Sequence, residues 1–283
     1  MIKINSEVFN VERFPNGELK LPILNSKNIS KDKEITNRIT LKYESETDLI
    51  VLMMLKAQLD LLYPDSTFSL VIAYMPYERM DRVHSKEEFF TLKMISNFIN
   101  NMHFNEVVIA EPHSDVCVAL LNNARGVNTT YNLAHRVLTN ELKLKKNDVV
   151  ICYPDAGAQK RYSQFEEIGY NNTIVGFKKR DWETGRILKL DILGSDVKGK
   201  TVIIVDDLSS FGGTFMLTAE ELKKKGAKEV ILVVTHAETN ILKGNIFNSD
   251  LIDKVYCTDS IIDINDETNK IEKLKIYPFR EVM

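Results

Sequence analysis

The sequence is poor in cysteine, with only three among its 283 residues. Cys117, Cys152 and Cys257 are far apart and lie in apolar surroundings. None has the paired spacing that a zinc site or a redox dithiol requires. We therefore expect three buried, reduced thiols, with neither a metal-binding nor a nucleophilic role.

Long apolar runs and long blocks of one charge are also missing. No window approaches the roughly 20 apolar residues needed to cross a bilayer, and the first residues lack the apolar run of a signal peptide. The 37 basic and 40 acidic residues give a net charge of −3 and are scattered along the chain. We therefore expect a cytoplasmic protein without a membrane partner and without general affinity for nucleic acid. Because the overall charge does not attract anions, an anionic ligand would have to bind at a local site.

Short apolar runs rich in valine and isoleucine alternate with segments of helical period. Because the runs are apolar at every position, they are typical of strands covered on both faces. The predicted strands are 69–74, 106–110, 148–152, 201–205 and 229–234, and the predicted helices are 48–62, 89–99, 114–123 and 215–225. Gly226 follows the last helix as a C-cap would. The alternation predicts an α/β fold of mostly parallel sheets with helices on both faces.

The chain has the length of one large domain or of two ordinary ones. An apolar run followed by Tyr-Pro or Met-Pro and by charged residues occurs at 70–82 and again at 149–161. This doubling predicts two similar α/β domains joined through the lysine-rich stretch 139–147. The predicted N-terminal domain spans residues 1–140 and the C-terminal domain spans residues 141–283.

Polar residues gather where the predicted strands stop, as in DDLSSFGGT at 206–214 and THAE at 235–238. In open α/β sheets this carboxyl edge binds ligands. Asp206 and Asp207 could hold the cis hydroxyls of a ribose or water bound to magnesium. The small residues up to Thr214 lead into a helix whose backbone N–H groups can receive a phosphate. Taken alone, the stretch also fits an ordinary strand-to-helix turn capped by serine and threonine.

Six motifs together resemble a known family. The loop at 206–214 is similar to the phosphoribosyl pyrophosphate loop that type I phosphoribosyltransferases share with ribose-phosphate pyrophosphokinases. The other five are similar to pyrophosphokinase segments: RFPNGE at 13–18, PYERMDR at 76–82, EPHSD at 111–115, PDAGAQKR at 154–161 and FKKR at 177–180. All six occur in the family's order, so the chain most resembles a ribose-phosphate pyrophosphokinase.

This resemblance implies transfer of the β,γ-diphosphate of ATP to the anomeric 1-hydroxyl of a ribose 5-phosphate unit, with release of AMP. It implies Mg²⁺ as cofactor, ATP as co-substrate and two domains of the type I phosphoribosyltransferase kind. The catalytic residues would be Lys178 and Arg180. ATP would be bound by Phe14, Asn16, Glu18, Arg79, Asp81 and His113. Magnesium would be held by His113, Asp155, Asp206 and Asp207. The acceptor would be bound by Asp206, Asp207, Ser209, Ser210, Phe211, Gly212, Gly213 and Thr214.

Each assignment has an ordinary alternative when taken singly. His113 could start a helix, Asp155 could be a turn acid, residues 178–180 could be a solvated basic face, and Asn16-Gly17 could be a simple turn. The joint occurrence of the motifs in order favours the enzyme. In the family, the Phe-Asn-Glu residues reach into a neighbouring subunit, which implies a homo-oligomer with the ATP site at a subunit interface.

The loop departs from the family pattern at two positions, where Ser210 and Phe211 replace an aspartate and a threonine that lie beside the 5-phosphate. An aromatic ring could stack on a base if that phosphate carried a nucleotide, as in ADP-ribose. Alternatively, Phe211 packs inward and the backbone around Gly212 and Gly213 holds a simple phosphate. The acceptor is thus either ribose 5-phosphate, giving phosphoribosyl pyrophosphate, or a 5-substituted ribose such as ADP-ribose, which would connect the enzyme with NAD metabolism.

Two other departures concern ATP and regulation. Glu111 replaces a metal-site aspartate, and the segment 83–88, VHSKEE, lacks the family's usual charges, which puts control by phosphate or ADP in doubt. A type I phosphoribosyltransferase and an inactive regulatory relative of the kinases remain as alternatives. The first would not need RFPNGE, PYERMDR or FKKR, and the retained Lys178, Arg180 and His113 argue against the second.

Overall fold

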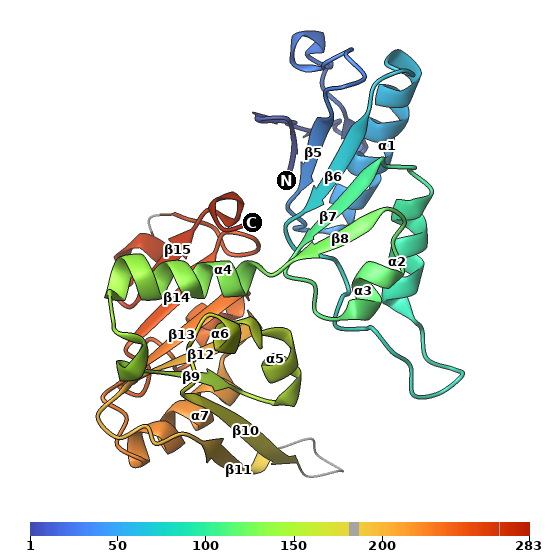
Figure 1. Ribbon diagram of the computed structural model, residues 1–283. Coiled ribbons are helices and arrows are strands. Elements are labelled where there is room, and N and C mark those ends of the chain that lie inside the picture. Colours follow the sequence, from blue (N-terminus) through green and yellow to red (C-terminus); the bar gives the residue numbers. More distant parts are fainter. Residues whose placement is uncertain (181–186, 266) are drawn as a thin grey trace. The chain divides into compact units, whose positions relative to one another are not determined.

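The computed structural model describes the backbone of residues 1–180, 187–265 and 267–283, and the side chains in this range except those of 178–180 and 187–190 (Figure 1). The chain forms two compact units, unit 1 from Met1 to Val127 and unit 2 from Asn128 to Met283. The boundary predicted at residues 140 and 141 lies inside unit 2. It does so because helix α4 (Thr129–Arg136) packs on central strands of the second sheet.

Unit 1 is built on a six-stranded sheet in the order β2-β1-β5-β6-β7-β8. Its parallel strands are β5 (Asn37–Leu41), β6 (Phe68–Ile72), β7 (Glu106–Ala110) and β8 (Ala124–Val127). The antiparallel edge consists of β1 (Ile2–Ile4) and β2 (Glu7–Val8), and β3 (Glu12–Arg13) pairs with β4 (Leu19–Lys20) in a separate hairpin. Helices α1 (Glu46–Leu62), α2 (Thr91–Asn100) and α3 (Asp115–Ala119) lie on one face of the sheet (Figure 1).

The core of unit 1 follows from the apolar spacing of α1. Leu52, Leu55 and Leu59 recur at three and four residues, so they share one face of the helix. They are almost completely buried in the same cluster as Leu70 of β6 and Ile109 of β7. This packing holds the helix layer against the sheet and thereby fixes where the carboxyl ends of β6 and β7 lie.

Unit 2 contains a seven-stranded sheet in the order β11-β10-β9-β12-β13-β14-β15. Its strands are β9 (Val149–Tyr153), β10 (Thr173–Arg180), β11 (Ile187–Gly194), β12 (Thr201–Ser209), β13 (Glu229–Ala237), β14 (Lys254–Thr258) and β15 (Leu274–Tyr277). All run parallel to their neighbours except β11, which is antiparallel to β10. Strand β9 pairs with β10 on one side and with β12 on the other, so the strand order reverses between β9 and β12.

Helices cover both faces of the second sheet. Val202 and Ile204 of β12 share a core cluster with α7 (Gly213–Lys224). The alternate residues Ile203 and Val205 share another cluster with side chains from α4, α5 (Ala156–Arg161) and α6 (Gln164–Glu167). Double coverage explains why the strand sequences are apolar at successive positions. The predicted α/β architecture of mostly parallel sheets flanked by helices is confirmed.

Short turns complete the described elements. They comprise 3-10 turns at Ser26–Asn28, Lys146–Asp148, Thr239–Lys243, Thr268–Lys270 and Phe279–Glu281, and a π-helical turn at Val137–Leu142.

Cys117, Cys152 and Cys257 are buried, as predicted, and burial raises the pKa of the Cys117 and Cys257 thiols. Within the described ranges, no helix has the length and apolar character needed to span a membrane.

Candidate active site

Three carboxylates lie at the carboxyl edge of the second sheet. Asp206 and Asp207 belong to the last part of β12, and Asp155 follows β9 by two residues. β9 and β12 are the strands between which the order reverses, and in open α/β sheets ligands bind in the crevice at that point. The structure therefore brings together three of the acids that were predicted from sequence, at the position where this fold class binds ligands.

The acids are poorly solvated. Asp206 is partly buried and Asp207 is buried, and the Asp206 Oδ1 atom accepts a hydrogen bond from the Asp207 backbone N–H at 3.0 Å. Burial, and then the neighbouring charges of Asp207 and Asp155, raise the pKa of Asp206 well above its usual value. A cation or a hydroxyl donor bound here would stabilise the ionised form of these carboxylates.

A basic side chain holds one member of the acid pair. Arg161, the last residue of α5, places its NH1 atom 3.2 Å from Oδ2 of Asp207, and only 21% and 7% of the two side chains are exposed. Asp155 caps the start of the same helix, accepting a hydrogen bond from the Ala158 backbone N–H at 3.1 Å. Arg161 ends the PDAGAQKR motif, but no role was predicted for it from the sequence. Its partner is distant in sequence, so only the sheet order reveals the pair.

The predicted acceptor loop, residues 209–214, connects β12 with α7. Gly212 has φ of 79°, in the left-handed region that favours glycine, and precedes the first residue of the helix. Phe211 is 55% exposed, so the inward-packed alternative for its ring is wrong. A Cβ atom on Gly244 would lie 2.1 Å from the Phe211 carbonyl oxygen, so the segment after β13 lies directly against the loop.

A glutamate that was not predicted also contacts this loop. The Ser210 Oγ atom donates to Oε2 of Glu238 at 2.6 Å, and Nδ2 of Asn240 donates to the same oxygen at 3.3 Å. The Glu238 backbone N–H also donates to the Ser209 carbonyl at 2.9 Å. The only sequence signal for Glu238 is its place after a strand, in THAE. Its contact with Ser210 depends on the pairing of β12 with β13.

In unit 1, the predicted ATP segments follow β6 and β7. The backbone N–H of His113 donates to Oε2 of Glu78 at 3.3 Å, so the PYERMDR and EPHSD segments lie side by side. Arg79 is exposed. Asp81 is largely buried and pairs with Arg82 at 3.3 Å between Oδ1 and Nε. Glu78 is buried, but no role was predicted for it from the sequence. Its only sequence signal was its place inside the PYERMDR motif.

The N-terminal motif forms an exposed hairpin tip. Residues 14–18 connect β3 with β4, and the Phe14 backbone N–H donates to the Glu18 carbonyl at 2.9 Å. The Asn16 Nδ2 atom donates to Oε2 of Glu18 at 2.9 Å, which rigidifies the turn. Phe14 is 47% exposed, and both polar side chains are exposed as well. The tip is therefore available for contacts beyond its own hairpin.

The predicted site residues are distributed over both units. The backbone of Lys178 and Arg180 lies in β10, but their side chains are outside the described residues. His113 belongs to unit 1 and Asp155 to unit 2, and each is described within its own unit. Among the described side chains, no three histidine, cysteine or acidic groups are arranged to hold a metal ion.

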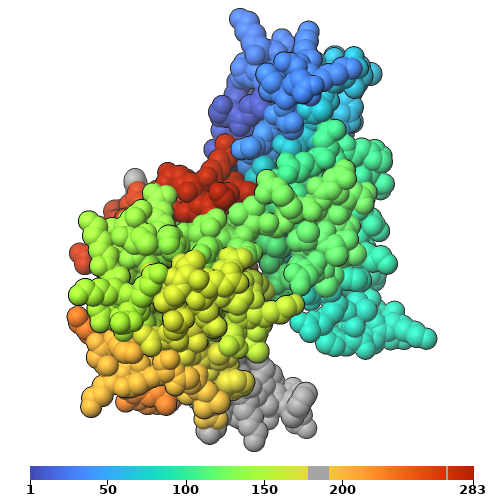
Figure 2. Space-filling model, viewed as in Figure 1, coloured from blue at the N-terminus to red at the C-terminus, as the bar shows by residue number. Residues whose placement is uncertain are grey.

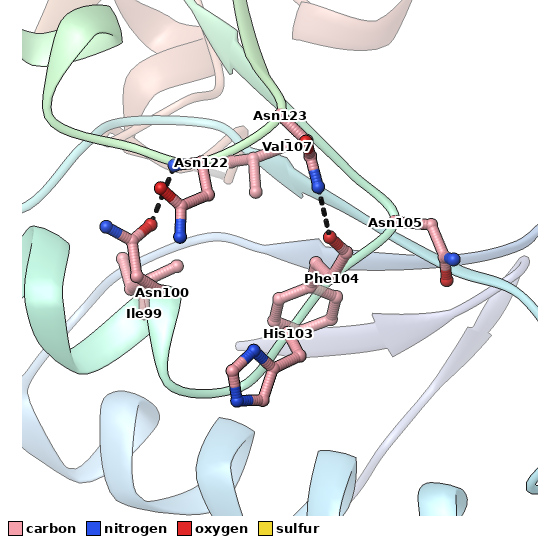
Figure 3. A pocket seen from close by; sticks show the side chains of 8 residues that line it. All are labelled: Ile99, Asn100, His103, Phe104, Asn105, Val107, Asn122 and Asn123. Carbon is pink, nitrogen blue, oxygen red and sulfur yellow. Dashed lines mark hydrogen bonds between the residues drawn. The ribbon is translucent and has the colours of Figure 1, made fainter.

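Unit 1 has two further surface features. A cavity of about 230 Å³ is lined by Asn100, His103, Asn105, Asn122 and their neighbours (Figure 3). It lies at the amino ends of β7 and β8, and none of the predicted site residues lines it. Residues 82–89, which include VHSKEE, are exposed throughout and form the turquoise protrusion in Figure 2.

The raised pKa of Asp206 leads to a prediction about stability. Ionisation is disfavoured in the folded state, so this carboxylate costs stability once the pH exceeds its unfolded-state pKa. We expect Asp206→Asn to stabilise the metal-free protein by roughly 1 kcal/mol at pH 7.5, a rise in Tm of about 2–4 °C. The gain should shrink towards pH 4, where wild-type Asp206 is protonated.

Calorimetry in EDTA across this pH range measures the effect. Asp250→Asn is the matched control, because the Asp250 side chain is fully exposed. A stability gain that is equal at both ends of the pH range, or absent at pH 7.5, would contradict the prediction.

Comparisons with known proteins agree with this architecture. Residues 130–264 match the model of the phosphoribosyl transferase domain. The chain is 26% identical to ribose-phosphate pyrophosphokinase of Mycoplasmopsis pulmonis over 97% of its own length and 83% of the relative's. It is 27% identical to ribose-phosphate pyrophosphokinase of Pyrococcus furiosus over 98% and 93% of the two chains. The fold is similar to that of phosphoribosylpyrophosphate synthetase from Mycobacterium smegmatis, with a TM-score of 0.72, 18% identity, and coverage of 98% of this chain and 87% of that one.

The fold and the acid-rich sheet edge define the class of unit 2, which is a phosphoribosyl transferase-type domain. The two pyrophosphokinase relatives match along almost the whole chain, including unit 1. Along almost its whole length the chain is similar to ribose-phosphate pyrophosphokinases, which are transferases.

Proposed function

We propose that the protein transfers the β,γ-diphosphate of ATP to the anomeric 1-hydroxyl of a ribose 5-phosphate unit and releases AMP. The observation that carries the proposal is the Asp206–Asp207 pair beside Asp155 at the point where the strand order reverses. The near-full-length similarity to pyrophosphokinases supports it, because a phosphoribosyltransferase would explain the match of unit 2 alone.

The acid pair suits the acceptor sugar. Carboxylates accept hydrogen bonds from two adjacent hydroxyls, and the ribose hydroxyls would be held by Asp206 and Asp207. Arg161 fixes the orientation of Asp207 through its ion pair. The backbone N–H groups at the start of α7, beyond Gly212, would receive the phosphate on the sugar's 5-position.

Diphosphate transfer depends mainly on placement and charge neutralisation. Lys178 and Arg180 would supply positive charge to the migrating diphosphate. Arg79, Asp81 and His113 of unit 1 would position ATP, together with Phe14, Asn16 and Glu18 of a neighbouring subunit. The exposed hairpin tip supports this last contribution, which requires a homo-oligomer. We propose a cytoplasmic location for the enzyme.

The acidic donors fit magnesium. Mg²⁺ binds through one or two carboxylates together with water and substrate phosphates, so a complete protein cage is not needed. Asp206 and Asp207 would hold one ion beside the ribose, and Asp155 and His113 would hold another with ATP. Bound magnesium would neutralise the negative charge of the phosphates.

The acceptor is either ribose 5-phosphate or a 5-substituted ribose such as ADP-ribose. The exposed ring of Phe211 favours the second, because it offers a face on which a base can stack. The product would then be ADP-ribose pyrophosphate, which would connect the enzyme with NAD metabolism.

The test is to incubate the protein with ATP, Mg²⁺ and either acceptor, and to identify the products by mass. We expect AMP in a 1:1 ratio with an acceptor that has gained a diphosphate. Formation of AMP with neither acceptor would overturn the proposal. Release of pyrophosphate from phosphoribosyl pyrophosphate and a base would instead indicate a phosphoribosyltransferase, and no turnover in either assay would indicate an inactive relative.

A further inference from the structure

We infer that Glu238 is a specificity-determining residue that disfavours acceptors ending in a phosphomonoester and favours those whose 5-phosphate carries a nucleoside group. This inference rests on the proposed function and concerns the same site. Glu238 lies one residue beyond β13, next to the strand that carries the acid pair. It is therefore on the acceptor side of unit 2 rather than in the ATP segments of unit 1.

Two hydrogen bonds fix the glutamate on the acceptor loop, and a third comes from Asn240 of its own segment. Oε2 accepts from Ser210 Oγ at 2.6 Å and from Asn240 Nδ2 at 3.3 Å. The backbone N–H binds the carbonyl of Ser209 at 2.9 Å. Because backbone and side chain are both anchored, the carboxylate is held at the loop instead of swinging into solvent. Among the side chains that the structure describes, no lysine or arginine forms an ion pair with it.

An anchored carboxylate changes which anion the loop accepts. A phosphomonoester carries about 1.5 to 2 negative charges on one phosphate at neutral pH. In ADP-ribose the phosphate attached to the acceptor ribose carries only one, and the second charge lies on the next phosphate, one bridging oxygen further away. The Glu238 carboxylate repels the more highly charged group most strongly, since the field of an uncompensated charge in a partly buried site is weakly screened. A simple 5-phosphate is thus the less suitable occupant of this loop.

The same carboxylate can contribute favourable contacts to a larger acceptor. Carboxylate oxygens accept hydrogen bonds from sugar hydroxyls and amino groups. Phe211, next to Ser210 in the chain, presents an exposed aromatic face. A nucleoside attached through the 5-phosphate would offer hydroxyls to Glu238 and a base to Phe211, and ribose 5-phosphate offers neither. Repulsion of one acceptor and recognition of the other together give selectivity.

The experiment compares kcat/KM for ADP-ribose and for ribose 5-phosphate in wild type and in Glu238→Gln. Glutamine keeps the size of the side chain and removes the charge. We expect wild type to prefer ADP-ribose by about tenfold or more, and Glu238→Gln to raise kcat/KM for ribose 5-phosphate by about tenfold. Glu220→Gln on α7 is the matched control, because Glu220 pairs with the surface residue Lys224 at 2.9 Å, and it should leave the ratio unchanged.

The outcomes separate this inference from the proposed function. AMP formation with ribose 5-phosphate as the better acceptor, or an unchanged ratio in Glu238→Gln, overturns the inference alone. AMP formation with neither acceptor overturns the proposed function and the inference with it. Should Glu238→Gln fail to fold, Glu238→Asp gives the second measurement, because the shorter side chain keeps the charge but withdraws the carboxylate from the Ser210 hydroxyl. It should lower the ratio of kcat/KM for ADP-ribose to that for ribose 5-phosphate, and an unchanged ratio would contradict the inference.

Discussion

Replacement of Lys178 by alanine is expected to lower kcat about 100-fold with the preferred acceptor, while the melting temperature stays within about 1 °C of wild type. Loss of one cation that stabilises charge in the transition state costs roughly 3 kcal/mol of barrier, which corresponds to this factor. Lys178 lies in β10, near the end of a strand that pairs with β11 in an antiparallel hairpin. The hairpin contributes Ile174, Val175 and Ile192 to the two core clusters of unit 2, and Lys178→Ala leaves these three residues unchanged.

The control for this prediction is Lys179→Ala, which removes the adjacent charge. Equal losses in both variants would point to a general electrostatic effect of the basic segment and would contradict a specific role for Lys178. Unchanged turnover in Lys178→Ala would show that the catalytic assignment is wrong. Rapid-quench measurement of AMP in a single turnover separates the transfer step from product release.

Replacement of Arg161 by methionine is expected to destabilise the protein by about 3 kcal/mol, because the Asp207 carboxylate would remain buried without this cation. For a unit of this size the melting temperature should fall by roughly 6–12 °C. Affinity for the acceptor should fall as well, since Asp207 loses the contact that orients it. Differential scanning calorimetry and acceptor titration measure the two effects.

A double-mutant cycle tests the cause. In Arg161→Met with Asp207→Asn, neither charge remains, so the double variant should recover part of the stability lost in Arg161→Met. Arg125→Met provides a matched control, because Arg125 and Glu106 form an exposed pair at 2.7 Å and exposed pairs contribute less than about 1 kcal/mol. A loss in Arg125→Met as large as that in Arg161→Met would rule out burial as the reason.

Much of the fold could be predicted because its central strands are apolar on both faces. The predicted strands 106–110 and 201–205 coincide with β7 and with the first part of β12. Strand β5, NRITL, was missed since it begins with a buried asparagine and an exposed arginine, and its strand character depends on pairing with β6. Helix α4 was missed because TTYNLAHR has few apolar residues and is stabilised by packing on the sheet.

The candidate site was predicted in its local parts and missed in its long-range contacts. Asp206 and Asp207 are adjacent in the chain, and their place at a strand end follows from the apolar run before them. The pairing of Arg161 with Asp207 and that of Glu238 with Ser210 depend on which strands become neighbours. Local sequence patterns do not encode strand order. The only signal for Glu238 was its place after a strand, and the only signal for Arg161 was its place at the end of the PDAGAQKR motif.

The close approach of Gly244 to the Phe211 carbonyl constrains how this site can diversify in evolution. Even a methyl group at position 244 would displace the backbone of the acceptor loop, although residue 244 is remote from it in sequence. Lineages that retain this loop conformation should therefore keep glycine at position 244 while the side chains at 210, 211 and 238 vary. Covariation would then appear among those three positions, and a change at 244 would accompany a rebuilt loop.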